Sequence, residues 1–159
     1  MNEHHFQTRA GVMYMDNELF NGTQVSFYNR RDTSAIIPYS NGREEGVAIY
    51  RYPGGNIKEI REFKHGRKTG IHNGWWPSGK PRFVYHFSND VYDGEVKDWY
   101  ESGQMFKDFH YVNGVEEGLQ KQYFNNGALQ FNYEARNGRQ YGLTGIKKCV
   151  NVRDSITKH

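Results

Sequence analysis

Four side chains that can bind a metal ion are evenly spaced along the chain. Glu62, His86, His110 and Glu134 follow one another at intervals of 24 residues. Imidazole and carboxylate groups are ligands that zinc accepts. If each interval adds two strands to a sheet, neighbouring members of this series lie about 9.6 Å apart. Because zinc needs ligand atoms about 2 Å away, we expect a solvated polar row that holds no metal, and at most a pH-sensitive contact with a partner.

The single cysteine is a second candidate for chemistry. Cys149 is flanked by Lys147 and Lys148, and adjacent lysines can lower the pKa of a thiol and make it reactive. One cysteine forms no internal disulfide, and no second thiol is present to resolve an oxidised one, so a structural thiol is the expected role. A copper(I) site with His4 and His5 is the alternative, although nothing in the spacing brings the two ends of the chain together.

The sequence contains none of the common catalytic motifs. It has no Gly-x-Ser-x-Gly, no glycine-rich phosphate loop and no His-Glu-x-x-His, which are patterns of hydrolases, nucleotide-binding proteins and zinc proteases. Paired carboxylates occur at residues 44–45 and 116–117, where we expect solvated turns. We therefore expect no enzyme activity and no cofactor.

A period of 24 residues organises the chain. Glycines keep this step from Gly22 to Gly142, and two adjacent aromatic columns share it. The first aromatic column reads Phe27, Arg51, Trp75, Trp99 and Tyr123, and the second aromatic column reads Tyr28, Tyr52, Trp76, Tyr100 and Phe124. A repeat of this length indicates a stack of similar structural units.

Each unit has the pattern of two strands and two turns. In the unit that starts at Gly94, residues 95–100 and 105–111 have strand character, and turns are expected at Gly103 and at residues 113–114. Glycine suits turns that need a positive φ, and Asn-Gly between apolar strands is typical of a hairpin. No unit has a helical pattern. The sequence therefore predicts an all-β fold, a repeat array of 24-residue β-hairpin units forming an elongated, twisted, antiparallel single sheet.

Alternation along the second strand of each unit predicts the two faces of this sheet. Positions 81, 83, 85 and 87 read Pro, Phe, Tyr and Phe, and every second position of residues 105–111 and 129–135 continues the pattern. These positions are predicted to form one apolar face. The intervening positions in the same three strands are mostly polar, so the other face is predicted to be polar.

The repeats leave a segment at each end of the sequence. We expect an N-terminal extension and half-repeat cap at residues 1–21, five repeats at residues 22–141, and a degenerate capping unit with a basic tail at residues 142–159. Residues 1–10 are expected to fray.

One unit carries the full pattern of a known repeat. The pattern Gly-x4-Trp-Tyr-x2-Gly-x7-Tyr-x2-Gly-x3-Gly is filled by Gly94, Trp99, Tyr100, Gly103, Tyr111, Gly114 and Gly118. It resembles the MORN repeat, in the bacterial variant found in YwqK-type antitoxin-like proteins, over about residues 11–145. The resemblance implies a twisted sheet of hairpins that serves as a scaffold for contacts with proteins or membrane lipids. The sequence departs from the pattern at Arg31, Arg51, Asp90 and Ala135.

The aromatic columns supply the candidate binding residues. Adjacent residues of a strand point to opposite faces, and a single sheet cannot bury both faces by itself, so one column is expected to be more exposed than the other. The candidate strip comprises Trp75, Trp76, Trp99, Tyr100, Tyr123 and Phe124. Exposed aromatic patches often mark partner surfaces, so we expect a scaffold that binds another protein.

The charge distribution narrows the choice of partner. The formal net charge is +3, and residues 147–159 carry all of it, through Lys147, Lys148, Arg153 and Lys158 against Asp154. A nucleic-acid partner needs a basic stripe on the folded body, so none is expected. A glycan stacked on the aromatic residues, or anionic lipid bound by the basic tail and the aromatic residues, are the alternatives. The sequence shows no signal peptide and no transmembrane run, but a fragment of an envelope protein would look the same, so the compartment stays open.

Overall fold

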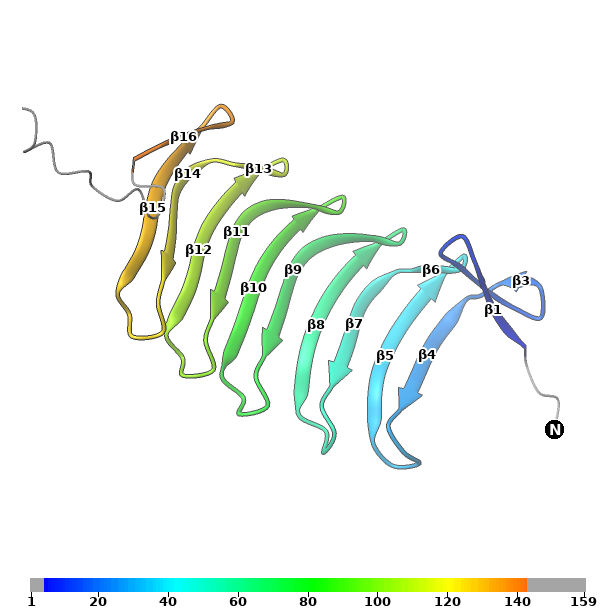
Figure 1. Cartoon of the computed structure of the whole chain (residues 1–159). Helices are drawn as coiled ribbons and strands as arrows, with labels where there is room; N and C mark the ends of the chain where they lie inside the picture. The colour runs from blue at the N-terminus through cyan, green and yellow to red at the C-terminus, as the bar shows by residue number, and fades with distance from the viewer. Residues whose placement is uncertain (1–4, 143–159) are drawn as a thin grey trace, which may run out of the picture.

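The structure is a computed structural model that describes residues 5–142. Its main element is a long antiparallel sheet in which tall hairpins stand side by side and are joined by turns at their upper and lower ends (Figure 1). The long strands are β4 (Gly22–Phe27), β5 (Thr33–Ser40), β7 (Gly46–Arg51), β8 (Ile57–Lys64), β9 (Arg67–Trp75), β10 (Pro81–Ser88), β11 (Val91–Trp99), β12 (Met105–Val112), β14 (Gly118–Tyr123) and β15 (Leu129–Arg136). Shorter strands are β6 (Arg43–Glu44), β13 (Val115–Glu116) and β16 (Arg139–Tyr141).

Strands that follow each other in sequence also lie next to each other in the sheet. The order is β4-β5-β7-β8-β9-β10-β11-β12-β14-β15-β16, with β6 paired to β5 and β13 paired to β12. Every pairing is antiparallel, and residues 5–142 contain no helix. The predicted all-β array of hairpins in a single long sheet is therefore confirmed.

The upper turns are tight because two successive residues adopt positive φ. Asn113 has a φ of 49° and Gly114 a φ of 80°. The Asn-Gly turns at residues 41–42 and 137–138 have the same signs, and so do residues 65–66 and 89–90. Asp90, one of the departures from the repeat pattern, has a φ of 71° and replaces glycine in a conformation that Asp tolerates. The turn geometry therefore survives the substitution.

We expect Gly114→Val to lower the free energy of unfolding by about 1–3 kcal/mol. A β-branched residue is strained at positive φ, and a Cβ at this position would also lie 3.2 Å from the Cβ of Val91 in the neighbouring unit. Urea denaturation followed by circular dichroism measures the loss. Gly114→Asn is the control, since Asn enters the left-handed region readily, and equal midpoints for the two variants would show that backbone strain does not govern this turn.

The buried side chains gather on one face of the sheet, which we call the aromatic face. On this face a ring on the second strand of a hairpin is paired with a glycine on the first strand. The pairs are Gly22 with Tyr39, Gly46 with Phe63, Gly70 with Phe87, and Gly94 with Tyr111. A facing ring covers backbone that glycine leaves bare. The core is thus a layer of rings lying on the sheet.

Contacts between rings connect neighbouring hairpins across this face. The imidazole of His72 lies 5.6 Å from the ring of Phe63 and 4.6 Å from that of Phe87, measured between centroids. Tyr92 continues the path, 4.8 Å from Phe87 and 5.2 Å from Tyr111. Ring pairs at such distances stabilise by about 0.5–1.5 kcal/mol beyond the area that they bury.

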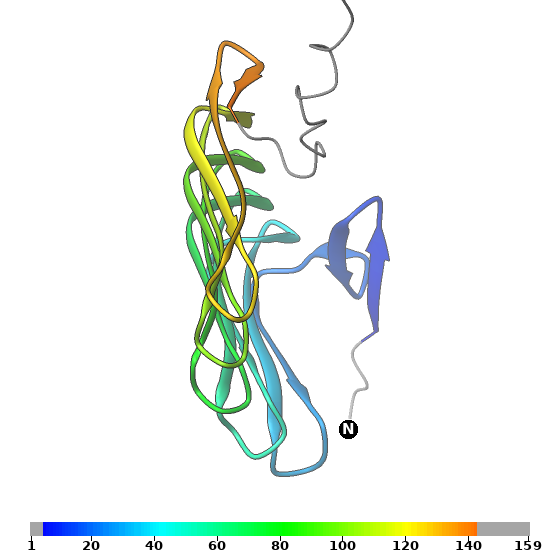
Figure 2. The same cartoon turned by 60° about the vertical axis from the view of Figure 1, so that its left-hand side comes forward.

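A separate three-stranded sheet lies beside the N-terminal end of the array. It comprises β1 (Phe6–Arg9), β2 (Val12–Met15) and β3 (Glu18–Leu19) and stands off one side of the main sheet (Figure 2). The buried ring of Phe20 contacts Phe6 and, on the aromatic face, Tyr39. The expectation that residues 1–10 fray is wrong for Phe6–Arg9, because pairing with β2 and the ring contact with Phe20 hold this segment.

Candidate interaction surface

The lower turns are closed by main-chain hydrogen bonds around one aromatic residue. The N–H of Trp76 donates to the carbonyl of Lys80, and the N–H of Gly79 donates to the carbonyl of Trp76, both at 2.8 Å. Tyr52, Tyr100 and Phe124 are bracketed in the same way in their own turns. A residue of the second aromatic column therefore stands at the start of each of these four turns, where main-chain hydrogen bonds fix its backbone.

Polar hydrogens of the second aromatic column join each unit to the next. The Tyr52 hydroxyl donates to the carbonyl of Trp75 at 2.9 Å. The indole N–H of Trp76 donates to the carbonyl of Trp99 at 3.1 Å. In the same way, the Tyr100 hydroxyl donates to the carbonyl of Tyr123, and the Tyr28 hydroxyl donates to the carbonyl of Arg51. Phenylalanine has no such hydrogen, so the series ends at Phe124. Tyr and Trp at these positions are thus structural links between repeats.

An extra residue enters the second strand of every hairpin near the lower turn. Trp75 pairs with Pro81 while Gly74 pairs with Phe83, which leaves Arg82 as a β-bulge. The same register shift occurs at residues 34, 58, 106 and 130. A bulge moves the alternation of faces by one residue. The residues on its two sides therefore no longer follow the face predicted from spacing.

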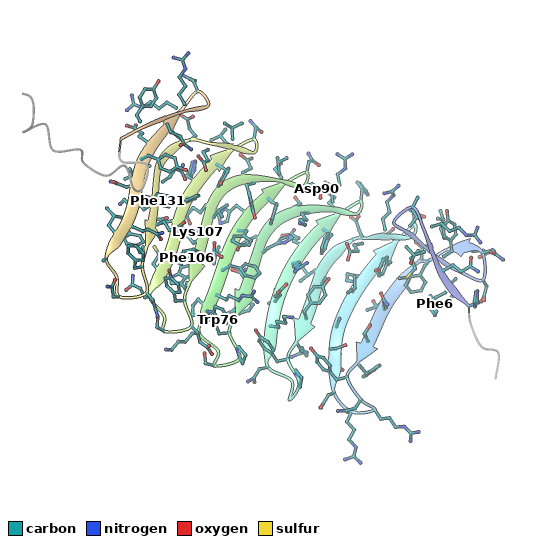
Figure 3. All side chains as sticks on the ribbon, in the orientation of Figure 1. Phe6, Trp76, Asp90, Phe106, Lys107 and Phe131 are labelled. Atoms are coloured by element: carbon teal, nitrogen blue, oxygen red, sulfur yellow. The ribbon has the colours of Figure 1, made fainter. Side chains whose placement is uncertain are left out.

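The bulged residues cover the second aromatic column on the aromatic face. The guanidinium of Arg82 lies 5.0 Å from the centroid of Trp76, and the ring of Phe106 lies 5.0 Å from that of Tyr100. Lys107, next to Phe106 in Figure 3, places its ammonium 5.1 Å from the Phe106 ring. Trp76 and Tyr100 are consequently half-buried.

The first aromatic column lies on the opposite face of the sheet. Its last three members pair across the hairpin with apolar residues: Trp75 with Pro81, Trp99 with Met105, and Tyr123 with Leu129. Together with Ile57 they form what we call the apolar row. The apolar row consists of Ile57, Trp75, Pro81, Trp99, Met105, Tyr123 and Leu129. Leu129 is 49% exposed and Ile57 38%, while Trp75, Trp99, Met105 and Tyr123 are half-buried, so the row is partly open to solvent.

The prediction that residues 81, 105 and 129 belong to the same face as Phe83 is wrong. These three residues precede the bulge, so they stay on the opposite face with the first aromatic column. The prediction that this face is polar is also wrong for part of its area. Pro81, Met105 and Leu129 contribute apolar surface that strict alternation assigned elsewhere.

Sequence reasoning missed an aliphatic patch on the opposite face of the first hairpins. Val25, Ile36, Ile49 and Ile60 are direct partners across four consecutive strands. Exposed Val47 and Ile71 extend the patch along the strands. The patch was missed because the prediction of a polar face used only the strands at residues 81–87, 105–111 and 129–135. Two columns at the 24-residue step, Val25 with Ile49 and Ile36 with Ile60, carry the signal that would have found it.

The same row of direct partners becomes charged toward the C-terminal hairpins. Lys97 faces Asp108, with 3.9 Å between Nζ and Oδ1, and its Nζ lies 2.8 Å from Oε1 of Glu95. The hydrogen bond from Lys97 lowers the pKa of the Glu95 carboxyl and raises the pKa of the Lys97 ammonium. Lys121 and Asn132 continue this row. The opposite face therefore offers apolar surface with a charged margin at one end.

The six predicted strip residues divide between the two faces. Trp75, Trp99 and Tyr123 lie in the apolar row. Trp76 and Tyr100 contact bulged residues on the aromatic face and tie the repeats together. The side chain of Phe124, the last member of the second column, is 48% exposed.

Glu116, expected to be a solvated turn residue, is instead part of the packing. Its carboxylate accepts hydrogen bonds from the hydroxyls of Tyr133 at 2.9 Å and Tyr111 at 3.4 Å, and from the amide of Gln140 at 3.2 Å. Burial and the charge of Glu116 raise the pKa of Tyr111 to about 12. The carboxylate links three strands at the C-terminal end of the sheet.

Within residues 5–142 no group of three or more His, Cys, Asp and Glu side chains is placed to hold a metal ion. His110 sits with its Nδ1 3.3 Å from the carbonyl of Glu117. No helix in the same range is long and apolar enough to cross a membrane. Cys149, the basic residues of the tail and His4 lie outside the described residues.

Two segments of the chain match a known repeat model. Residues 44–65 and 92–113 match the MORN repeat variant. The first segment contains β7 and β8, and the second contains β12 and all of β11 except Val91. The matches begin 48 residues apart, which is twice the 24-residue period. A search of curated proteins gave no match. MORN repeats commonly serve as scaffolds for protein or membrane interaction.

Proposed function

We propose that the chain is a non-catalytic scaffold that binds another protein through the apolar row. One observation carries this proposal: seven apolar residues follow one another across the lower part of the opposite face. Phe20, which follows the small sheet β1–β3, contacts the aromatic face at Tyr39, and the small sheet leaves the apolar row uncovered in the described part of the chain. The pattern of glycine and aromatic columns supports placing the chain in the bacterial YwqK-type antitoxin-like branch of this repeat.

The composition of the apolar row suits a protein partner. Aromatic residues and methionine are enriched at protein interfaces, and tryptophan and tyrosine supply much of the binding energy. The backbone of Trp75, Trp99 and Tyr123 is also fixed, because their main-chain carbonyls accept hydrogen bonds from side chains of the second aromatic column. A partner therefore meets rings whose backbone is already ordered, which lowers the entropic cost of binding.

Trp75→Ala with Trp99→Ala should reduce recovery of the partner at least about tenfold. The measurement is affinity capture from a lysate of the native host, read by mass spectrometry. The matched control is Tyr92→Ala with Tyr111→Ala, which removes two rings of the aromatic face and keeps both the apolar row and the hydrogen bonds to its carbonyls. Circular dichroism shows whether both variants remain folded. Equal loss of the partner from both folded variants would count against the apolar row as the binding surface.

Two other outcomes would replace the protein partner. If no protein is enriched, binding to anionic vesicles that weakens steeply with ionic strength would favour a membrane surface. Salt-resistant binding of a glycan with quenching of tryptophan fluorescence would favour a carbohydrate ligand. Either result would overturn the proposal of a protein scaffold.

A further inference from the structure

A cavity of about 300 Å³ lies on the aromatic face over β8, β9, β10 and β11. Four rings line it, from Phe83, Tyr85, Phe87 and Tyr92. The charged side chains around it are Glu59, Arg61, Lys68, Arg82 and Asp98. This volume is at the lower end of the range for small-ligand sites. The cavity is on the other side of the sheet from the apolar row, so binding of a ligand in the cavity does not depend on the proposed function.

The Phe83 ring of the cavity wall lies where a side chain is missing from the neighbouring strand. Gly74 lies between Glu59 and Phe83 in a row of direct partners across the sheet. The Phe83 ring occupies the space that a side chain at Gly74 would need, since a Cβ there would lie 2.2 Å from Cε1 of the ring. The equivalent position holds Tyr50 in the preceding hairpin and Asp98 in the following one. A ring placed over glycine at this position is therefore specific to the central hairpin.

The acidic groups of the cavity are already engaged within the protein. Glu59 is 7% exposed and accepts a hydrogen bond of 2.8 Å from Nε of Arg61. Asp98 accepts the hydroxyl of Tyr85 at 2.5 Å. The imidazole of His72, also on the wall, is 3% exposed, and burial lowers its pKa, which keeps it neutral at pH 7. Glu59 is thus paired with Arg61, whereas Asp98, which accepts from a neutral hydroxyl, keeps its negative charge at the cavity.

Two cations at the cavity have no acidic partner among residues 5–142. Arg82 and Lys68 take part in none of the ion pairs of this range. Aromatic faces position both of them: the guanidinium of Arg82 lies over Trp76, and Nζ of Lys68 lies 5.2 Å from the centroid of Phe87. Three cations and two carboxylates leave the cavity with one excess positive charge.

We propose that this cavity binds an oxyanion, a carboxylate or phosphate group, carried on a flat aromatic body. Arg82 presents a planar fork of donors that matches two oxygens of such a group, and Lys68 provides a second positive contact. The rings of Phe83 and Tyr85 stack on each other, 4.5 Å apart and inclined by 14°, and together with Phe87 and Tyr92 they form an aromatic wall for the body of the ligand. A free aromatic acid and a phosphorylated tyrosine of a peptide both present this chemistry.

The experiment titrates the full chain with phenyl phosphate and with inorganic phosphate at pH 7.5, followed by isothermal calorimetry and by amide shifts in NMR spectra. Phenyl phosphate should bind at least about tenfold more tightly than inorganic phosphate, because only the former uses the aromatic wall. Shifts should concentrate in β9, β10 and β11. Absence of saturable binding by the unmodified protein, or equal affinity for the two probes, would overturn the proposal.

Variants separate the site from general attraction to a basic surface. Arg82→Gln should weaken binding of phenyl phosphate at least about tenfold, and so should Lys68→Met, whose exposed position makes failure to fold unexpected. The control is Lys58→Gln, because Lys58 occupies the equivalent bulge and lies over Tyr52, outside the cavity. Equal weakening by the control variant would contradict the assignment.

The source of the ligand can be identified by a third titration of the same protein. A short peptide containing phosphotyrosine that binds more tightly than phenyl phosphate would assign the site to a peptide. A peptide that binds no better would assign it to a free aromatic acid. In either case, the proposed oxyanion chemistry is tested by whether Arg82→Gln and Lys68→Met weaken binding of the ligand.

Discussion

Gln120→Glu should lower the free energy of unfolding at pH 7 by about 3–5 kcal/mol, the cost of an uncompensated buried charge. The Gln120 side chain is completely buried. Its Oε1 accepts the N–H of His110 at 2.9 Å, while its Nε2 donates to the carbonyls of His110 at 2.9 Å and Glu117 at 3.1 Å. A carboxylate at this position can still accept the N–H of His110. Its other oxygen would place a lone pair and a negative charge against the carbonyl oxygens of His110 and Glu117, which can only accept hydrogen bonds.

The loss for this variant should depend on pH. Burial raises the pKa of the introduced carboxyl above the unfolded value of about 4.3. A carboxylic acid with a raised folded pKa contributes most stability below its unfolded pKa, and that stability falls as pH rises through the folded pKa. The variant should therefore lie closer to the parent at pH 4 than at pH 7, because the protonated group can donate one hydrogen bond.

Urea unfolding at both pH values provides the measurement for Gln120→Glu. The control is Gln122→Glu, since Gln122 lies on the same strand and face, is part-exposed, and makes a single side-chain bond of 2.9 Å to Gln130. A loss that is independent of pH, or no larger than that of the control, would mean that the buried amide does not fix this part of the sheet.

Gly74→Val should destabilise the sheet by about 3 kcal/mol, although valine favours strands. A Cβ at this position would lie 2.2 to 2.6 Å from three atoms of the Phe83 ring. Gly74 is not among the residues with positive φ, so the expected loss arises from the collision with the ring. Thermal or urea unfolding measures it directly.

A double-mutant cycle with Phe83→Ala tests this cause. Phe83→Ala alone should cost about 3–5 kcal/mol, and the combined variant should cost less than the two single losses together, by about 2 kcal/mol, because the new side chain enters the space that the ring leaves. Phe131→Ala in β15 is the distant control, for which the losses should add. Additive losses in the Phe83 cycle as well would show that the ring is not the obstacle.

The sequence was sufficient to predict the architecture because its signals are local and repeat. Asn113-Gly114 marks a turn by backbone preference alone, and the 24-residue step gives the same signal in other units. The rings of Phe63, Phe87 and Tyr111 also recur at this step, which indicates packing on one face. Repetition removes the ambiguity that a single short strand would leave.

The assignment of faces near the lower turns could not be read from spacing. Met105 and Lys107 are two residues apart in one strand, so alternation places them on the same face. The bulge at Phe106 places them on opposite faces. The bulged positions 34, 58, 82, 106 and 130 share no residue type from which a bulge could be predicted. The candidate surface was therefore predicted through Trp75, Trp99 and Tyr123, without the apolar partners that complete the row.

Photo-crosslinking in the native host tests the central claim most directly. A benzophenone amino acid is placed at Met105, in the apolar row, or at Lys107, next along the same strand on the aromatic face. We expect one protein to be crosslinked from position 105 and not from position 107. Crosslinking of the same protein from position 107 alone, or equally from both positions, would contradict binding through the apolar row.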